Sequence, residues 1–316
     1  MQTKKIVLSN KQKGLYFGLL YKNFQKHRVA YIMIIPVILY YIIFHYIPMF
    51  GVLIAFKEYS PHLGVFKSPW VGFDHFVSFI TDRYFGRIFL NTLTISCKNI
   101  LIGFPLPIIF SLLINEVSNI KFKKAIQTVT YLPHFVSLVV ICGLLVSFLG
   151  VDGIFNDIIE MLGGERIAFL QEGKYFSNIY VWSGVWQELG WSSIIYISAL
   201  SAIDTQLYEA CALDGGGRFR QAIHVTLPGL STTIIILFIM RLGAALSIGF
   251  EKIILLYNEM IYDKADVIST YVYRKGLLDS NWSYSTAVSL FNSVINIVLL
   301  IGSNAISRKI NDISLW

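Results

Sequence analysis

The stretch YEACALDGGGRFRQAIHVTLP, Tyr208–Pro228, is the most polar and glycine-rich piece in the second half of an otherwise apolar chain. Long apolar runs flank it on both sides. The function of a polar segment between two membrane-length apolar runs indicates what kind of membrane protein the chain is.

Its composition marks this 316-residue chain as a polytopic membrane protein. Hydrophobic residues make up 55% and charged residues 14%, whereas soluble proteins carry roughly 25% charged residues. The 23 Phe, 18 Tyr and 6 Trp suit aromatic belts at the membrane interfaces. We attribute the net charge of +7 to basic cytoplasmic loops rather than to nucleic-acid binding. The three cysteines form no C-x-x-C or His-bearing spacing, so neither a disulfide framework nor a zinc site is expected.

Six stretches are long and apolar enough to cross a membrane as helices, which takes about 20 residues each. The first is too long for the apolar region of a signal peptide, and no A-x-A site follows it, so we expect it to be retained. The predicted spans are Val29–Phe50, Ile88–Ile114, Ile126–Leu149, Ser177–Leu200, Pro228–Gly249 and Tyr284–Ile306.

The placement of lysine and arginine predicts the orientation. Basic residues precede the first span, follow the second and follow the sixth, so six spans would put all three groups on the cytoplasmic side. The acidic loop Gly150–Phe176 would then lie outside and Tyr208–Pro228 inside. We predict a cytoplasmic basic segment 1–28, a six-helix all-α domain 29–306 with its polar cytoplasmic loop at 201–228, and a cytoplasmic tail 307–316.

The first half of the polar loop has the pattern of a short helix. Ala199–Leu213 carries a small apolar face, and Asp204 or Thr205 can cap a helix here. Asp214–Gly217 then interrupts the helix, because glycine accepts left-handed backbone at a helix C-terminus without steric cost.

Helical spacing resumes in Arg218–Leu227, and Pro228 suits the first turn of the next membrane helix. The loop is therefore predicted to form two short helices joined by a glycine turn. One interpretation is an ordinary amphipathic connector resting on the membrane. That interpretation does not explain why Glu209, small residues and a glycine turn occur together at this spacing.

The loop resembles the EAA loop of type I ABC import permeases. The family pattern is E-A-A, three residues, G, nine residues, I, one residue and L-P. Cys211 replaces the second alanine and Val225 replaces the isoleucine, and both changes are small. The residues that match the pattern are Glu209, Ala210, Gly215, Leu227 and Pro228.

Other motifs extend the resemblance over nearly the whole chain, to carbohydrate-uptake permeases. These motifs resemble those of the permease branch that imports oligosaccharides from complex polysaccharides in Gram-positive bacteria. They resemble those of MalF-type maltose permeases more distantly. The segments that carry this resemblance are Val71–Phe76, Asn91–Leu93, Leu132–Ser137, Trp186–Asp204, Gly249–Asn258, Ala265–Leu277 and Ser314–Trp316.

The resemblance implies a permease subunit of an ATP-driven importer of a sugar, expected to be an oligosaccharide, in the bacterial plasma membrane. It implies a second homologous permease, two ABC ATPase subunits and an extracellular solute-binding lipoprotein as partners, with membrane lipid around them. The chain has no Walker A pattern, so ATP and Mg would be used by the partner ATPase. We expect no catalytic residue, cofactor or metal in this chain.

By the same resemblance, the EAA loop would dock into a cleft on the ATPase subunit. Glu209 would make a charged contact, small apolar residues would fill the cleft, and Gly215 would set the turn. ATP binding would move the docked loops and rock the membrane helices between inward-open and outward-open states. The predicted docking residues are Glu209, Ala210, Cys211, Leu213, Asp214, Gly215 and Pro228.

Lys98, Glu188 and Arg241 lie inside predicted spans at similar depth. A charge at the centre of a membrane helix costs roughly 2.5–3.5 kcal/mol or more unless it is paired or hydrated. Glu188 could therefore pair with Lys98 or Arg241 and lock helices together. Alternatively, the three charges surround a hydrated cavity, where carrier sites commonly lie. Trp186 and Trp191 would stack on sugar rings in that cavity, or serve only for packing.

Two positive charges against one negative would suit an acidic sugar such as a uronate. In the sixth span, serines and asparagines recur at three- to four-residue spacing, and this stripe either joins helices at the partner permease or lines the path. The predicted substrate path consists of Glu188, Trp186, Trp191, Arg241, Lys98, Asn292 and Asn296.

Other classes of protein fit the sequence less well. His45, His134 and His224 are isolated along the chain, so we expect no metal site or proton relay. No Ser/His/Asp set supports a membrane enzyme. A secondary transporter driven by an ion gradient stays as the alternative, because intramembrane charges suit it, although the polar loop would then lack a purpose.

Overall fold

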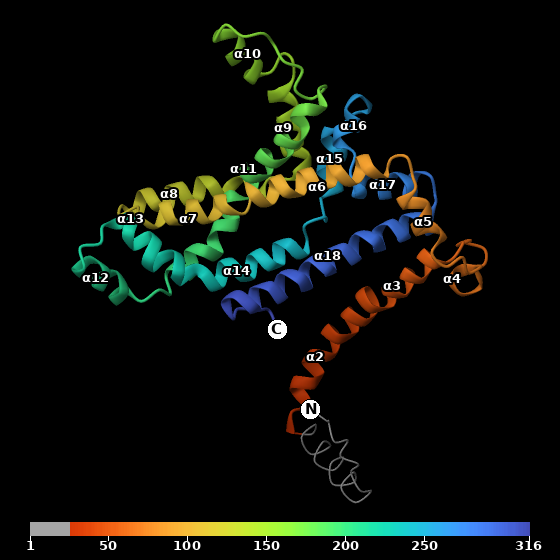
Figure 1. Cartoon of the computed structure of the whole chain (residues 1–316), viewed down its shortest axis with the longest axis horizontal. Helices are drawn as coiled ribbons and strands as arrows, with labels where there is room; N and C mark the ends of the chain where they lie inside the picture. Colours follow the sequence, from red (N-terminus) through yellow and green to blue (C-terminus); the bar gives the residue numbers. More distant parts are fainter. Residues whose placement is uncertain (1–25) are drawn as a thin grey trace, which may run out of the picture.

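The computed structural model describes residues 26–316, so the prediction for the basic segment 1–28 falls almost wholly outside the described residues. The described part of the chain is helical throughout, apart from loops and one isolated antiparallel bridge between Lys57 and Trp70. Figure 1 shows its helices in a bundle, from which α2 and α10 extend.

The first half contains α2 (Arg28–Tyr41), η1 (Ile42–Tyr46), α3 (Ile47–Met49), η2 (Phe50–Phe56), α4 (Gly64–Lys67), α5 (Asp74–Ile80), α6 (Phe85–Leu101), α7 (Pro105–Asn115), α8 (Ile120–Tyr131), η3 (Leu132–Phe135), α9 (Leu138–Leu149) and α10 (Ile154–Met161). The second half contains α11 (Gly173–Leu200), α12 (Thr205–Leu213), α13 (Arg218–Gln221), η4 (Ala222–Thr226), α14 (Leu227–Gly243), α15 (Phe250–Leu256), η5 (Glu259–Ile261), α16 (Tyr262–Ala265), α17 (Ile268–Tyr273), η6 (Arg274–Leu278) and α18 (Trp282–Asn311).

Five helical segments of the described chain, rather than six, are both long and apolar enough to cross a membrane by length and composition. α11, which contains the predicted fourth span, is a continuous helix of 28 residues. Polar and small residues such as Gln187, Glu188 and Gly190 make it less apolar than the five segments. The five segments are Arg28–Phe56, Phe85–Asn115, Leu138–Met161, Arg218–Gly243 and Trp282–Ile310.

The predicted third span, Ile126–Leu149, is wrong as a continuous helix. α8 ends at Tyr131, and α9 starts only after Ser137, whose hydroxyl accepts a hydrogen bond from the Val140 N–H at 3.4 Å. Pro133 lies in the short turn between the two helices. A proline and a serine cap end one helix and start another even inside an apolar run.

α11 is the central helix of the bundle and packs against α6, α7, α8 and α14. Its Phe176, Tyr180 and Val181 are buried in a core shared with α15. A second core joins α5, α6, α17 and α18 around Phe79 and Tyr271. Because α11 packs against protein on several sides, it needs a less apolar surface than a helix that faces lipid.

α12 projects from one end of the bundle, whereas α4, α5 and α17 lie at the other end (Figure 1). The segment from α2 to η2 leans away from the other helices, and its apolar window is 0% buried within this chain. The polar loop of the sequence is thus placed at the end of the bundle opposite α4, α5 and α17, where Arg218 lies 3.7 Å from Glu116 in the loop between α7 and α8.

Candidate functional site

α12 is a short helix that its own residues start and stop. The Asp204 carboxylate accepts a hydrogen bond from the Gln206 N–H at 2.9 Å, so Asp204 is the N-cap and Thr205 is the first helical residue. The helix ends at Leu213, as the sequence predicted, but the predicted start at Ala199 is wrong, because Ala199 and Leu200 belong to the end of α11.

The turn after α12 closes with two backbone hydrogen bonds. Gly216 donates to the Cys211 carbonyl at 2.8 Å, and Gly215 donates to the Ala212 carbonyl at 3.0 Å. This is the Schellman pattern, which needs a left-handed residue after the helix. Gly215 supplies it, with φ at +75°. The predicted glycine turn is confirmed.

The second short helix differs from its prediction at the proline. α13 continues through the π-helical η4 into α14, so Arg218–Gly243 is one helical segment. Pro228 therefore lies within this segment and does not open a separate helix. The wider π-type turn just before Pro228 accommodates a residue that has no N–H to donate.

The surface of α12 faces away from its own chain. Leu213 is 88% exposed and Phe219, just beyond the turn, is 80% exposed. Glu209 and Ala210 are exposed too. A contact of 3.2 Å between the hydroxyls of Tyr208 and Thr226 holds α12 against η4. α12 is thus a fixed helix that presents apolar and acidic side chains outward, which is the geometry of a docking surface.

A second feature is a cavity of about 720 Å³ between α7, α11, α14 and α15. Three of the predicted substrate-path residues, Glu188, Trp191 and Arg241, line it together. Gln187, Ser192 and Tyr196 add polar groups to its wall. The cavity is named the α11 cavity below.

Glu188 has a partner that the sequence did not indicate. The Nδ1 atom of His134 lies 3.2 and 3.1 Å from the two carboxylate oxygens of Glu188. The His134 ring stacks on Trp191, with centroids 4.3 Å apart and planes 3° from parallel. The predicted ion pair of Glu188 with Lys98 or Arg241 is therefore wrong, and His134 is not isolated. The turn between α8 and α9 brings His134 to this place.

Lys98 is held elsewhere. Its ammonium donates hydrogen bonds to the Ser177 hydroxyl at 2.8 Å and to the Asn178 side-chain oxygen at 2.7 Å, near the start of α11. Lys98 is not among the residues that line the α11 cavity. Counting residues from the start of each predicted span placed the three charges at one depth, but the helices do not bring Lys98 to Glu188.

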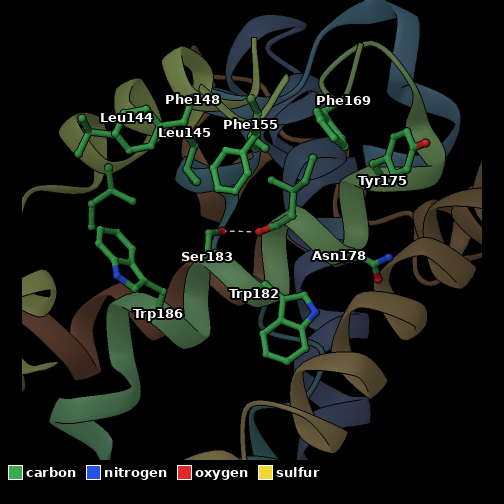
Figure 2. A pocket seen from close by; sticks show the side chains of 13 residues that line it. Leu144, Leu145, Phe148, Phe155, Phe169, Tyr175, Asn178, Trp182, Ser183 and Trp186 are labelled. Carbon is green, nitrogen blue, oxygen red and sulfur yellow. Dashed lines mark hydrogen bonds between the residues drawn. The ribbon is translucent and has the colours of Figure 1, made fainter. Parts of the chain in front are cut away.

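Trp186 lines a different, almost wholly apolar pocket of about 580 Å³ between α9, α10 and α11. Figure 2 shows Phe148 and Phe155 above α11 and Trp186 and Trp182 on α11, with the ring of Trp182 directed away from the two phenylalanines. Neighbouring positions on α11 thus serve two separate pockets, because successive side chains leave a helix in different directions.

Asn292 and Asn296 join α18 to the irregular segment after α14. The side-chain oxygen of Asn296 accepts from the Leu246 N–H at 3.1 Å, and its amide donates to the Ser247 hydroxyl at 2.9 Å. The Asn292 amide donates to the Leu246 carbonyl at 3.4 Å. These bonds favour the interpretation as a stripe that joins helices, here within one chain.

Lys252 is a charged residue of the cavity wall that the sequence did not reveal. The predicted fifth span ends at Gly249, which placed Lys252 in a loop, yet α15 packs back against α9 and the α11 core. The lysine is 7% exposed and lines the α11 cavity. The two adjacent charges, Glu251 and Lys252, in the otherwise apolar run Phe250–Leu256 were the signal that could have found it.

An exposed helix at the end of a bundle of membrane-length helices, together with a polar cavity between its central helices, suits the membrane component of a multi-subunit transport system. Residues 103–312 match the family of binding-protein-dependent transport system inner membrane components, and the chain belongs to this family. It is a multi-pass permease of the ABC importer class rather than an enzyme or an ion-driven secondary transporter.

Two curated relatives from Bacillus subtilis (strain 168) align over almost the full chain. Protein LplB is 45% identical over 92% of this chain and 92% of its own length. The polygalacturonan/rhamnogalacturonan transport system permease protein YteP is 41% identical over 91% of this chain and 90% of its own length.

A solved structure shows the same fold. A chain of the bacterial alginate ABC transporter, crystallised with its alginate pentasaccharide-bound periplasmic protein, superposes with a TM-score of 0.87. It is 40% identical, and the match covers 94% of this chain and 99% of that one. The fold is therefore that of a type I ABC permease.

Proposed function

We propose that this chain is one of two homologous permease subunits of an ATP-driven importer that carries an oligosaccharide into the cell. Two ABC ATPase subunits and an extracellular solute-binding lipoprotein complete the assembly. Two relatives are named for polygalacturonan/rhamnogalacturonan and for alginate, and these substrates support an oligosaccharide. In this arrangement six helices cross the plasma membrane, with α11 as the fourth, and both termini are cytoplasmic.

The exposed α12 with its Schellman turn is the observation that carries the proposal. Glu209, Ala210, Cys211, Leu213, Asp214 and Gly215 belong to this helix and turn, and Pro228 follows in the helix that α12 is held against. Docked in a cleft on the ATPase, a rigid α12 transmits the closing of that subunit to α14, because α13, η4 and α14 form one helical segment. ATP and Mg are used by the ATPase, since the chain has no Walker A pattern.

The α11 cavity is the part of the substrate path that this chain contributes. Glu188, Trp191 and Arg241 lie in its wall, where an aromatic ring and polar groups suit a sugar. Trp186, Lys98, Asn292 and Asn296 lie outside this cavity, and their predicted place on the path stays a prediction.

Uptake by the reconstituted transporter tests the proposal. The complete complex in proteoliposomes, with binding protein outside and labelled trigalacturonate as the probe, should accumulate label only when ATP is enclosed with the ATPase. Ionophores that collapse proton and sodium gradients should leave the uptake unchanged. Uptake without ATP, or its loss on adding the ionophores, would refute the proposal.

A further inference from the structure

Lys252 is a buried cation with unused hydrogen-bonding capacity. Its ammonium donates to the Tyr180 carbonyl at 3.1 Å and lies 4.9 Å from the centre of the Tyr180 ring. An ammonium has three N–H donors, so two are left for other acceptors. Lysine is almost never buried unless it is paired, because an unpaired buried charge is costly.

The space beside the ammonium is open. A Cβ added to Gly184 would lie 3.4 Å from the Lys252 Nζ atom, so this glycine leaves one side of the ammonium uncovered. Gly184 and Lys252 both line the α11 cavity. The free donors of Lys252 are therefore next to a space large enough for a ligand group.

The charges around the α11 cavity do not cancel. Arg241 lines the same cavity, is exposed within this chain, and forms no ion pair with any residue in 26–316. Glu188 is the acidic residue of the cavity wall, and its carboxylate contacts His134 instead of either cation. Two cations thus face the cavity without a carboxylate bound to them.

We propose that Lys252 and Arg241 form a carboxylate-binding subsite of the α11 cavity, and that the transported oligosaccharide is acidic. This rests on the proposed function, because it assigns the substrate class to the cavity of that same permease. A uronate carboxylate offers two acceptor oxygens to the ammonium and the guanidinium. Trp191, also in the cavity wall, provides an aromatic face for the sugar ring.

The same geometry disfavours a neutral sugar as the main substrate. A hydroxyl is a weaker acceptor than a carboxylate, so a neutral sugar would leave the two cations with only the Glu188 carboxylate, which contacts His134, as counter-charge in a partly dehydrated site. Lys252 takes the place that the sequence assigned to Lys98, so two cations and one carboxylate still line the cavity.

Binding to the purified transporter tests this proposal directly. The probes are trigalacturonate and its fully methyl-esterified form, which differ in the charge of their carboxyl groups. The complete complex in nanodiscs, without binding protein, is compared for the wild type, Lys252→Met, Arg241→Met and Lys174→Met. Lys174 is the matched control, because it is exposed, pairs with Glu172 and lies outside the cavity.

Lys252→Met should weaken trigalacturonate binding at least about tenfold, the loss expected for one charge-assisted hydrogen bond. Arg241→Met should weaken it in the same direction, while Lys174→Met and methyl-ester binding should change less than about twofold, since neither involves the lost charge pair. Arg241→Met also covers the case in which Lys252→Met does not fold, because Arg241 is exposed.

Three results would overturn the subsite: a wild type that does not prefer trigalacturonate, cavity variants that bind it as the wild type does, or equal losses for both probes. If a carboxylate of the second permease neutralised Lys252, the Lys252→Met variant would bind trigalacturonate as the wild type does. ATP-driven uptake separates the two proposals. If the wild type imports no oligosaccharide, the proposed function fails; if it imports and the variants keep their affinity, the subsite alone fails.

Discussion

Replacing Gly215 by valine should uncouple α12 from the ATPase while leaving the membrane helices intact. Gly215 has φ at +75°, and a side chain there would meet no atom within 4 Å. The cost is therefore one of backbone conformation rather than of crowding. A left-handed conformation costs an L-residue about 1–2 kcal/mol, which lowers the equilibrium constant for forming the turn about 5- to 30-fold.

The assay is ATP-dependent uptake of trigalacturonate by the reconstituted complex, with permease content measured in the same vesicles. Gly215→Val should lose most uptake at normal permease content. Gly215→Asn is the matched control, because asparagine tolerates left-handed backbone, and it should transport close to the wild-type rate. Equal uptake by the valine variant, or an equal loss in both variants, would refute the role assigned to the turn.

Three further variants test separate contacts. Gly190→Ala should lower the melting temperature of the complex, since its Cβ would overlap the Thr130 carbonyl of α8, at a cost of about 1–3 kcal/mol; an unchanged melting temperature would contradict the close packing of α8 and α11. Glu209→Lys should abolish uptake without reducing membrane insertion, because Glu209 is exposed on α12. Normal uptake at normal expression would contradict the charged contact with the ATPase that is assigned to Glu209. His134→Ala should reduce uptake of trigalacturonate by freeing Glu188 to repel the carboxylates, and restored uptake in His134→Ala/Glu188→Gln would confirm that reason, whereas continued loss would refute it.

The docking loop could be predicted from the sequence because its structure is set locally. An aspartate cap needs only the next few residues, and a left-handed glycine needs only the helix before it. Asp204 and Gly215 therefore have the conformations that the pattern indicated. What binds to α12 is not a local property, and only the family resemblance suggested an ATPase.

The α11 cavity was predicted only in part, because its contacts depend on where helices break and how they pack. The apolar run Ile126–Leu149 hides the turn that carries His134 to Glu188. Lys252 follows the predicted end of a span, and hydropathy gives no sign that α15 folds back into the bundle. The hydrogen bonds of Lys98 to Ser177 and Asn178 could not be predicted for the same reason. They depend on how α6 and α11 are positioned along each other, which is set by tertiary packing.

Photocrosslinking from α12 tests the central claim most directly. A benzoylphenylalanine at Leu213, which is 88% exposed, should crosslink to the ATPase subunit in native membranes. The same group at Phe66, which is 81% exposed and belongs to α4 at the opposite end of the bundle, should not. No ATPase adduct from position 213, or equal adducts from both positions, would contradict the account of α12 as the docking helix.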